Sequence, residues 1–188
     1  MKSSILSSSL FIIYLSLIFY ASLPALSLNL YESVCNEAGQ DANTCMNALK
    51  TDSRIVAATN YLDLSKFILE MAFNKATSVQ SYFEKVAIRF PEDNGIRKCS
   101  VVFYTNVLEY FKSASNKLGY NPRGALDDIC DAGKEAMNCD KALEAEKSHN
   151  PQMHALNTGI HLLAEISISS VNHFALMGEI SHRKLLNE

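Results

Sequence analysis

The sequence lacks the short motifs by which many hydrolases, nucleotide-binding proteins and metalloenzymes are identified. It has no Gly-x-Ser-x-Gly nucleophile elbow, no phosphate-cradling glycine loop and no His-Glu-x-x-His zinc motif. It has no Cys-x-x-Cys pair and no Asn-x-Ser/Thr glycosylation acceptor. Its 17 basic and 20 acidic residues are interspersed, so no basic stripe offers a site for nucleic acid. These absences argue against an enzyme, a zinc protein and a nucleic-acid-binding protein, and no cofactor or metal is expected.

Residues 1–27 have the layout of a secretory signal peptide. Lys2 precedes a charge-free run from Ser3 to Tyr31, and Ala25 and Ser27 occupy the two positions that signal peptidase reads. We therefore expect cleavage after Ser27, secretion, and no membrane contact afterwards. The competing interpretation is a retained membrane anchor, because the uncharged run is long enough to span a bilayer. The serines within the run and its cleavage-like end favour the signal peptide.

The mature chain, 28–188, is expected to form one domain with a formal charge of −4, from 16 basic and 20 acidic residues. Export would place its five cysteines where disulfides persist. At most two intramolecular bridges can form, and the residues alone leave fifteen pairings open. Cys35 and Cys45 are near enough to close a small hairpin, whereas Cys99 and Cys139 would join elements 40 residues apart. Each bridge would stabilise the fold by roughly 2 to 4 kcal/mol.

Beyond residue 52, apolar residues recur every three or four positions, the period of an amphipathic helix. This pattern predicts helices over 63–89, 96–118 and 151–177, and a third in chain order that starts at Pro122 after the N-cap Asn121. Gly119 is expected as a left-handed cap, and Gly133 is expected to break the third helix before a restart at Asn138. The residues predicted to face inward are Leu64, Phe67, Ile68, Met71, Ala72, Val79, Phe83, Val86 and Ala87; Cys99, Phe103, Tyr110, Ala114 and Leu118; and Met153, Leu156, Ile160, Leu163, Val171, Phe174 and Met177.

Short connections at 90–95, 119–121 and 148–150 require consecutive helices to run antiparallel. The predicted fold class is therefore all-α. It consists of an up-and-down four-helix bundle over 52–178, preceded by a short helical hairpin over 28–50 that holds the first two cysteines.

The side chains that could carry chemistry have simpler structural interpretations. His154 and His161 are separated by two helical turns, about 10 Å, which is too far for one metal ion. Asp127 and Asp128 are neighbours that point to different faces, so we interpret them as a solvated first turn. Cys130 could act as a nucleophile with a distant histidine. Burial in the bundle as a small hydrophobic residue is the favoured interpretation.

The chain resembles the plant invertase and pectin methylesterase inhibitor family along essentially its whole mature length. The resemblance is carried by the close pair Cys35 and Cys45, the interval from Cys99 to Cys139, the stretch 63–65 (Asp-Leu-Ser) that opens the long helix, and the helix order. It implies two disulfides, Cys35–Cys45 and Cys99–Cys139, and a free thiol at Cys130. It also implies a 1:1 complex in the apoplast or cell wall, with the vacuole as the alternative location, in which the bundle covers the active-site cleft of a carbohydrate-active enzyme.

The target enzyme is less clearly indicated. Invertase inhibitors of this family carry Pro-Lys-Phe at the place that here holds Pro122, Arg123 and Gly124, the residues expected to contact the partner. A cation is kept, but an aromatic side chain of the kind that often dominates interface energy is lost. The triplet 155–157 (Ala-Leu-Asn) resembles the invertase-inhibitor branch, while residues 42–43 (Ala-Asn) stand where many relatives have an aromatic residue. The acidic charge favours a basic partner, as pectin methylesterases often are.

We therefore expect an inhibitor of pectin methylesterase, with acid invertase as the alternative target. The departures at Ala42 and Gly124 motivate a second interpretation, a secreted structural bundle without inhibitory activity. A third is a bundle that binds a small molecule in a cavity that the sequence does not reveal.

Overall fold

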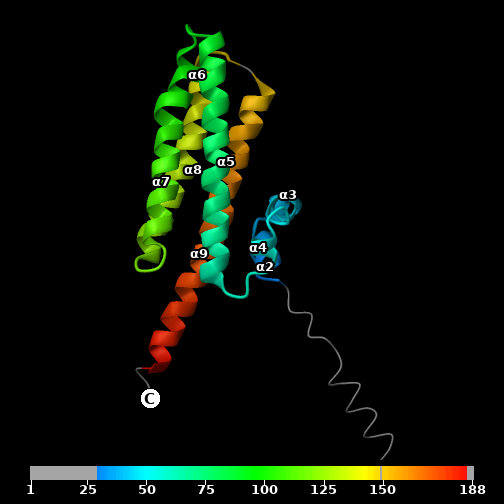
Figure 1. Cartoon of the computed structure of the whole chain (residues 1–188), viewed down its shortest axis with the longest axis vertical. Helices are drawn as coiled ribbons and strands as arrows, with labels where there is room; N and C mark the ends of the chain where they lie inside the picture. The colour runs from blue at the N-terminus through cyan, green and yellow to red at the C-terminus, as the bar shows by residue number, and fades with distance from the viewer. Residues whose placement is uncertain (1–28, 149, 186–188) are drawn as a thin grey trace, which may run out of the picture.

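The computed structural model describes residues 29–148 and 150–185, and side chains as far as residue 179. The signal peptide expected over 1–27 lies outside these residues. In Figure 1 the long helical segments run up and down beside one another. They are α5 (Tyr61–Arg89), a run made of α6 (Asn94–Lys98), η2 (Cys99–Phe103) and α7 (Tyr104–Lys117), then α8 (Pro122–Ala145) and α9 (Pro151–Leu185). The expected all-α antiparallel bundle is confirmed.

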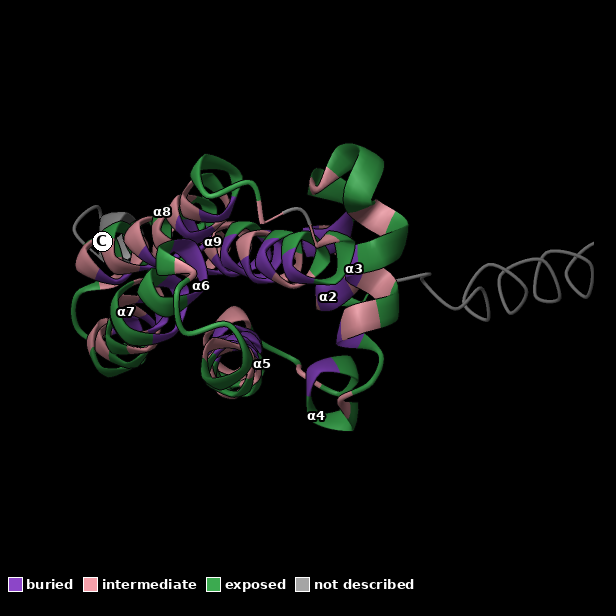
Figure 2. Cartoon of the chain, turned by 90° about the horizontal axis from the view of Figure 1, so that it is seen from above, coloured by how far each residue is buried: buried purple, intermediate pink, exposed green. Residues whose placement is uncertain are grey.

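The hairpin before the bundle consists of α2 (Leu30–Glu37), a short 3-10 turn η1 (Gly39–Asp41) and α3 (Ala42–Leu49), followed by the one-turn helix α4 (Ser53–Val56). Seen from above, these elements lie to one side of the bundle, next to α9 and α5 (Figure 2). The disulfide Cys35–Cys45 joins α2 to α3. Arg54 fastens α4 to α5, because its guanidinium binds Glu70 at 3.0 Å and lies 5.0 Å from the ring centre of Phe67.

The first long helix starts two residues earlier than predicted. Asn60 is its N-cap and accepts a hydrogen bond from the Asp63 N–H at 2.9 Å. The Asn60 amide in turn donates to the Asp63 carboxylate at 2.8 Å, so the pair fixes the first turn. All nine residues predicted to face inward on this helix are buried or packed against the core.

The second helical run differs from the prediction because η2 is a π turn. The Tyr104 N–H donates to the Cys99 carbonyl, five residues back, which inserts one residue into the helical repeat. The buried face therefore moves by one position: Tyr104, Val107 and Phe111 are fully buried, whereas Phe103 and Tyr110 are only partly buried. Phe103 and Tyr110, which were predicted to face inward, do pack against the core, but at its edge. Cys99, Ala114 and Leu118 are buried as predicted.

The predicted break in the third helix is wrong, since α8 runs without interruption from Pro122 to Ala145. Gly133 is a point of close helix contact. A Cβ atom there would lie 3.2 Å from the Ala164 Cβ and 3.3 Å from the His161 Nδ1, both on α9. The glycine lets two helices approach each other at a cost in helix propensity of about 1 kcal/mol. A restart at Asn138 is therefore not needed.

The left-handed helix cap is at a different residue from the one predicted. Gly119 does not have a positive φ; among the described residues, Gly39 and Lys147 do. Lys147, at φ 56°, ends α8 in a Schellman motif, in which the Ser148 N–H donates to the Leu143 carbonyl at 2.9 Å and the Lys147 N–H to the Glu144 carbonyl at 3.0 Å. A lysine takes the conformation because these two bonds close the helix end.

Two further predictions were wrong. Cys130 is exposed, because it lies on the outer face of α8 between the buried positions Ile129 and Ala132. Met177 is 59% exposed, because α9 continues past Gly178 to Leu185 and extends beyond the ends of its neighbours (Figure 1). By length and composition alone the part of α9 from Pro151 to Glu179 could cross a membrane, a property that the core helix of a bundle shares.

Candidate functional site

The residues predicted to contact a partner, Pro122, Arg123 and Gly124, form the first turn of α8, directly after the α7–α8 connection. Asn121 is the N-cap, and its side-chain oxygen accepts a hydrogen bond from the Gly124 N–H at 3.1 Å. Pro122 occupies the first helical position, where its missing N–H costs no hydrogen bond. The sequence therefore fixes a stiff helix start at this end of the bundle.

The preceding connection is held to α7 from the other side. The Asn121 N–H and the Tyr120 N–H both donate to the Lys117 carbonyl, at 2.8 and 3.1 Å, and Leu118 is buried in the core. The Lys117 ammonium lies 2.7 Å from the Asp128 carboxylate, which joins α7 to α8 across the connection. The hydrogen bond to Asp128 raises the pKa of Lys117. The whole turn, 118–124, is thus preorganised.

This turn presents two large side chains to solvent. Tyr120 is 77% exposed and the Arg123 side chain 86% exposed. Arg123 meets Glu179 of α9 at 3.4 Å, and both side chains are open to water. Exposed ion pairs of this kind contribute little to stability. A carboxylate on another protein can therefore replace Glu179.

Gly124 has a local structural role. A Cβ atom on Gly124 would lie 2.4 Å from the Asn121 Nδ2 and 3.0 Å from its Cγ. Any larger residue must displace the side chain that caps α8. An aromatic residue at 124 is therefore not compatible with the position of the Asn121 side chain that caps α8.

Tyr120 was not predicted from the sequence. Its neighbours Gly119 and Asn121 were interpreted as end signals of two helices, and Tyr120 between them was assigned no role. An aromatic residue between such signals is the pattern that would have indicated an exposed ring on a turn. Tyr120 gives the turn an aromatic side chain two positions before Pro122.

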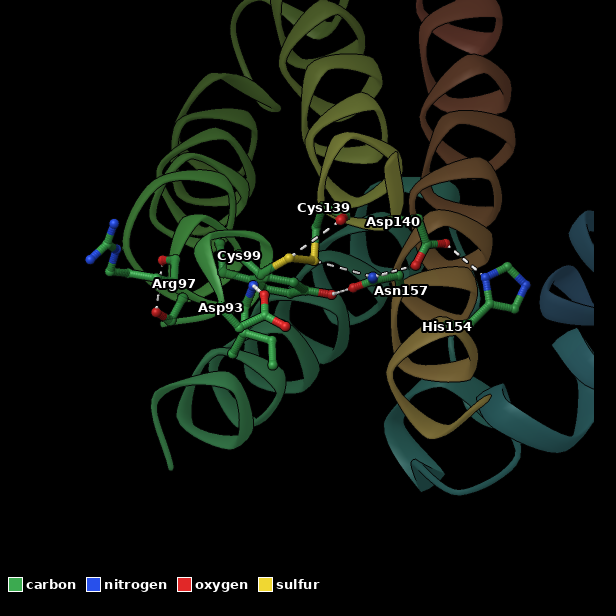
Figure 3. Close-up of a disulfide and its surroundings, with 10 residues drawn as sticks. Asp93, Arg97, Cys99, Cys139, Asp140, His154 and Asn157 are labelled. Atoms are coloured by element: carbon green, nitrogen blue, oxygen red, sulfur yellow. Dashed lines mark hydrogen bonds and ion pairs between the residues drawn. A yellow bond between two sulfur atoms is a disulfide. The ribbon is translucent and has the colours of Figure 1, made fainter. Parts of the chain in front are cut away.

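Asn157, part of the stretch 155–157 that resembles the invertase-inhibitor branch, is 1% exposed and belongs to a buried polar network (Figure 3). The Tyr104 hydroxyl donates to Asn157 Oδ1 at 2.7 Å, and Asn157 Nδ2 donates to Asp140 at 2.6 Å. Asp140 in turn lies 3.0 Å from His154 at the surface. Burial raises the pKa of Tyr104, so its hydroxyl keeps its proton. Asn157 therefore supports the fold and does not face a partner.

The second disulfide, Cys99–Cys139, lies against this network, since Asn157 Nδ2 is 3.2 Å from Cys139 Sγ. It joins the π turn to α8. The structure thus holds both bridges that the family resemblance implies, with Cys130 left as a thiol. The described part of the chain contains no group of three His, Cys, Asp or Glu that could hold a metal ion.

No family model and no curated protein matches the sequence. Solved structures do match. The crystal structure of a pectin methylesterase inhibitor from Arabidopsis thaliana aligns with a TM-score of 0.57 and 16% identity, covering 78% of this chain and 97% of that one. The chain shares that fold. A mutant form of a pectin methylesterase inhibitor from Arabidopsis aligns with a TM-score of 0.56 and 17% identity, covering 76% of this chain and 95% of that one.

The residues of the stretch 63–65 each have a structural role in this fold. Asp63 belongs to the capping pair with Asn60, and Leu64 is buried. The Ser65 and Ser170 hydroxyls form a buried hydrogen bond of 2.8 Å that joins α5 to α9. These residues therefore support the bundle and do not face a partner.

Proposed function

We propose that this protein is a secreted, non-catalytic inhibitor of pectin methylesterase that forms a 1:1 complex and covers the active-site cleft of the enzyme. The observation that carries the proposal is the fold it shares with the two pectin methylesterase inhibitors. In this chain one disulfide closes the hairpin and a second joins the π turn to α8. A disulfide-stapled chain is typical of proteins outside the cytosol. We place it in the apoplast, with the vacuole as the alternative.

The turn 118–124 is the part of the surface that we assign to the partner. Tyr and Arg are the residue types most often found at the energetic centre of protein interfaces. Here Tyr120 and Arg123 stand together on a backbone held by the Asn121 cap and the Lys117–Asp128 pair. A preorganised turn loses little conformational entropy on binding, so more of the contact energy appears as affinity.

Acid invertase is the alternative target. The observation that favours it is the order of proline and cation at Pro122 and Arg123, with Tyr120 as a nearby aromatic group. The guanidinium of Arg123 can pair bidentately with a carboxylate in an active site.

A titration tests the proposal directly. The purified, oxidised protein is added to pectin methylesterase and, separately, to acid invertase, and residual activity is measured between pH 4 and 7. Stoichiometric loss of pectin methylesterase activity supports the proposal. Loss of invertase activity alone would identify acid invertase as the target. Full activity of both enzymes across this range would overturn both and favour a structural bundle without inhibitory function or a bundle that binds a small molecule.

A further inference from the structure

A single histidine on α9 contacts both the end of α2 in the hairpin and the start of α5 in the bundle. His173 is on α9, and its Nε2 lies 2.6 Å from Glu37 Oε1 at the end of α2. Its ring stacks on Tyr61 at the start of α5, with centroids 4.6 Å apart and planes 11° apart. The Ser169 hydroxyl, one turn earlier on α9, donates to the other oxygen of Glu37. Both carboxylate oxygens of Glu37 are therefore used to hold α2 on the bundle.

The contacts of Glu37 lie beside a surface hollow. The hollow, of about 490 Å³, lies between α2–η1 and α9, and its lining includes Val34, Glu37, Gly39 and Glu165. Gly39 also has a positive φ, so the chain turns sharply just beyond Glu37. The polar contacts of Glu37 close the rim of this hollow. Val34 of α2 and Ile166 of α9 are buried beside the hollow, so apolar packing holds the body of α2 and the polar contacts of Glu37 add to it at the end of that helix.

The position and the contacts of Glu37 both act on its charge. Glu37 is the last residue of α2, where the carbonyl end of the helix dipole disfavours a negative charge and a nearby cation offsets it. The Ser169 hydrogen bond, and with it the contact to His173, lowers the pKa of Glu37 below its ordinary value of 4.5. A carboxyl with a lowered folded-state pKa stabilises the fold above pH 4.5 and loses this contribution as the pH falls through the lowered value.

Imidazole groups change charge between about pH 5 and 8. The attraction between an imidazolium and the Glu37 carboxylate is therefore strongest in mildly acidic solution and is lost as the pH rises through this range. The titratable groups that meet the ring from other elements are Glu37 of α2 and Tyr61 of α5. On α9 itself, Glu165 pairs with His161 and Glu179 with Arg123.

We propose that His173 and Glu37 form a pH-sensitive latch, which holds the α2–η1 segment on the bundle in mildly acidic solution and loosens it near and above neutrality. The latch is a property of the folded chain and is independent of the target enzyme. It gives an acidic extracellular protein a hairpin that is more firmly attached at low pH.

Hydrogen exchange of the purified, oxidised protein tests the latch. Amide protection over residues 37–42 is measured by mass spectrometry at pH 5.5 and 7.5, after correction for the intrinsic exchange rate at each pH. We expect protection to fall roughly two- to fivefold at the higher pH, the range that corresponds to a partly exposed ion pair. In His173→Gln and in Glu37→Gln, protection over this segment should be low at both pH values.

His161→Gln is the matched control, because His161 is on the same helix but pairs with Glu165 of that helix. This variant should keep the fall seen in the wild type. Equal protection of the wild type at both pH values would overturn the proposal, and so would an undiminished fall in Glu37→Gln, whose partly exposed side chain can be changed without emptying a core position.

Discussion

The Tyr104 hydroxyl donates a 2.7 Å hydrogen bond to the side-chain oxygen of Asn157, and both side chains are buried where α7 meets α9. This bond is the innermost link of the polar network that runs past the Cys99–Cys139 bridge to Asp140 and His154 (Figure 3). Tyr104 and Asn157, the two fully buried members, each satisfy a polar group that would otherwise be buried without a partner. The network and the bridge together fix the junction of three helices.

Removal of this hydroxyl should destabilise the fold. Tyr104→Phe leaves the Asn157 oxygen buried and unsatisfied, at a cost of about 1–3 kcal/mol in the free energy of unfolding. Urea unfolding followed by circular dichroism measures the change. Tyr120→Phe is the control, since that ring is 77% exposed and its hydroxyl can bond to water. Equal loss of stability in the two variants would contradict the network.

Gly95 should tolerate no side chain. A Cβ atom there would lie 2.6 Å from the Ala142 carbonyl oxygen, so α6 and α8 would have to separate. Gly95→Ala should therefore destabilise the protein by about 1–3 kcal/mol. Gly159→Ala is the matched change, because Gly159 lies within α9 with open space at its Cβ position. There the gain in helix propensity should stabilise the protein by up to about 1 kcal/mol. Thermal unfolding measures both effects, and midpoints shifted in the same direction in the two variants would refute these two predictions.

Elements with a regular repeat could be predicted from the sequence, and local exceptions could not. The inward face of α5 follows the 3.6-residue period over 29 residues, so most of it was predicted, although the fully buried Ser65, Leu69 and Ala76 were missed. The π turn at Cys99 shifts the face of α7 by one residue, and no composition signal marks it. Gly133 was read as a break because the sequence does not show that α9 packs against it. The contacts of a glycine exist only in the folded bundle.

The cysteines illustrate the same limit. Their number and spacing left the pairing open, and the family resemblance supplied it. Only the structure shows that Cys130 faces outward while Cys99 and Cys139 are buried. In the candidate site, Pro122 and Arg123 could be found by alignment to a family motif. Tyr120 lies outside that motif, and its exposure follows from the turn that its own N–H and the Asn121 N–H close on the Lys117 carbonyl.

The two kinds of cysteine should respond differently to substitution. Cys99→Ser opens a covalent loop of 40 residues and leaves a buried hydroxyl, so we expect a loss of about 2–4 kcal/mol. Cys130→Ser changes an exposed thiol and should leave the melting temperature within about 2 °C of the wild type. Calorimetry of the two variants under non-reducing conditions makes the comparison. Indistinguishable melting temperatures would show that the long bridge contributes nothing.

The turn 118–124 should carry much of the affinity for the target enzyme. Tyr120→Ala and Arg123→Ala each remove one exposed side chain without touching the core, so the inhibition constant should rise at least about tenfold while the melting temperature stays unchanged. Phe90→Ala is the control, because Phe90 is an aromatic residue, 57% exposed, that follows α5 at the opposite end of the bundle. Its inhibition constant should equal that of the wild type. If wild-type protein inhibits and all three variants inhibit equally well, binding uses another face of the bundle. If Phe90→Ala alone weakens inhibition, the contact lies at the opposite end of the bundle.

Tyr120 and Arg123 are held by the same turn of the backbone, so the double variant tests whether the two side chains bind cooperatively. A combined loss smaller than the sum of the two single losses would show that the two side chains bind as a unit.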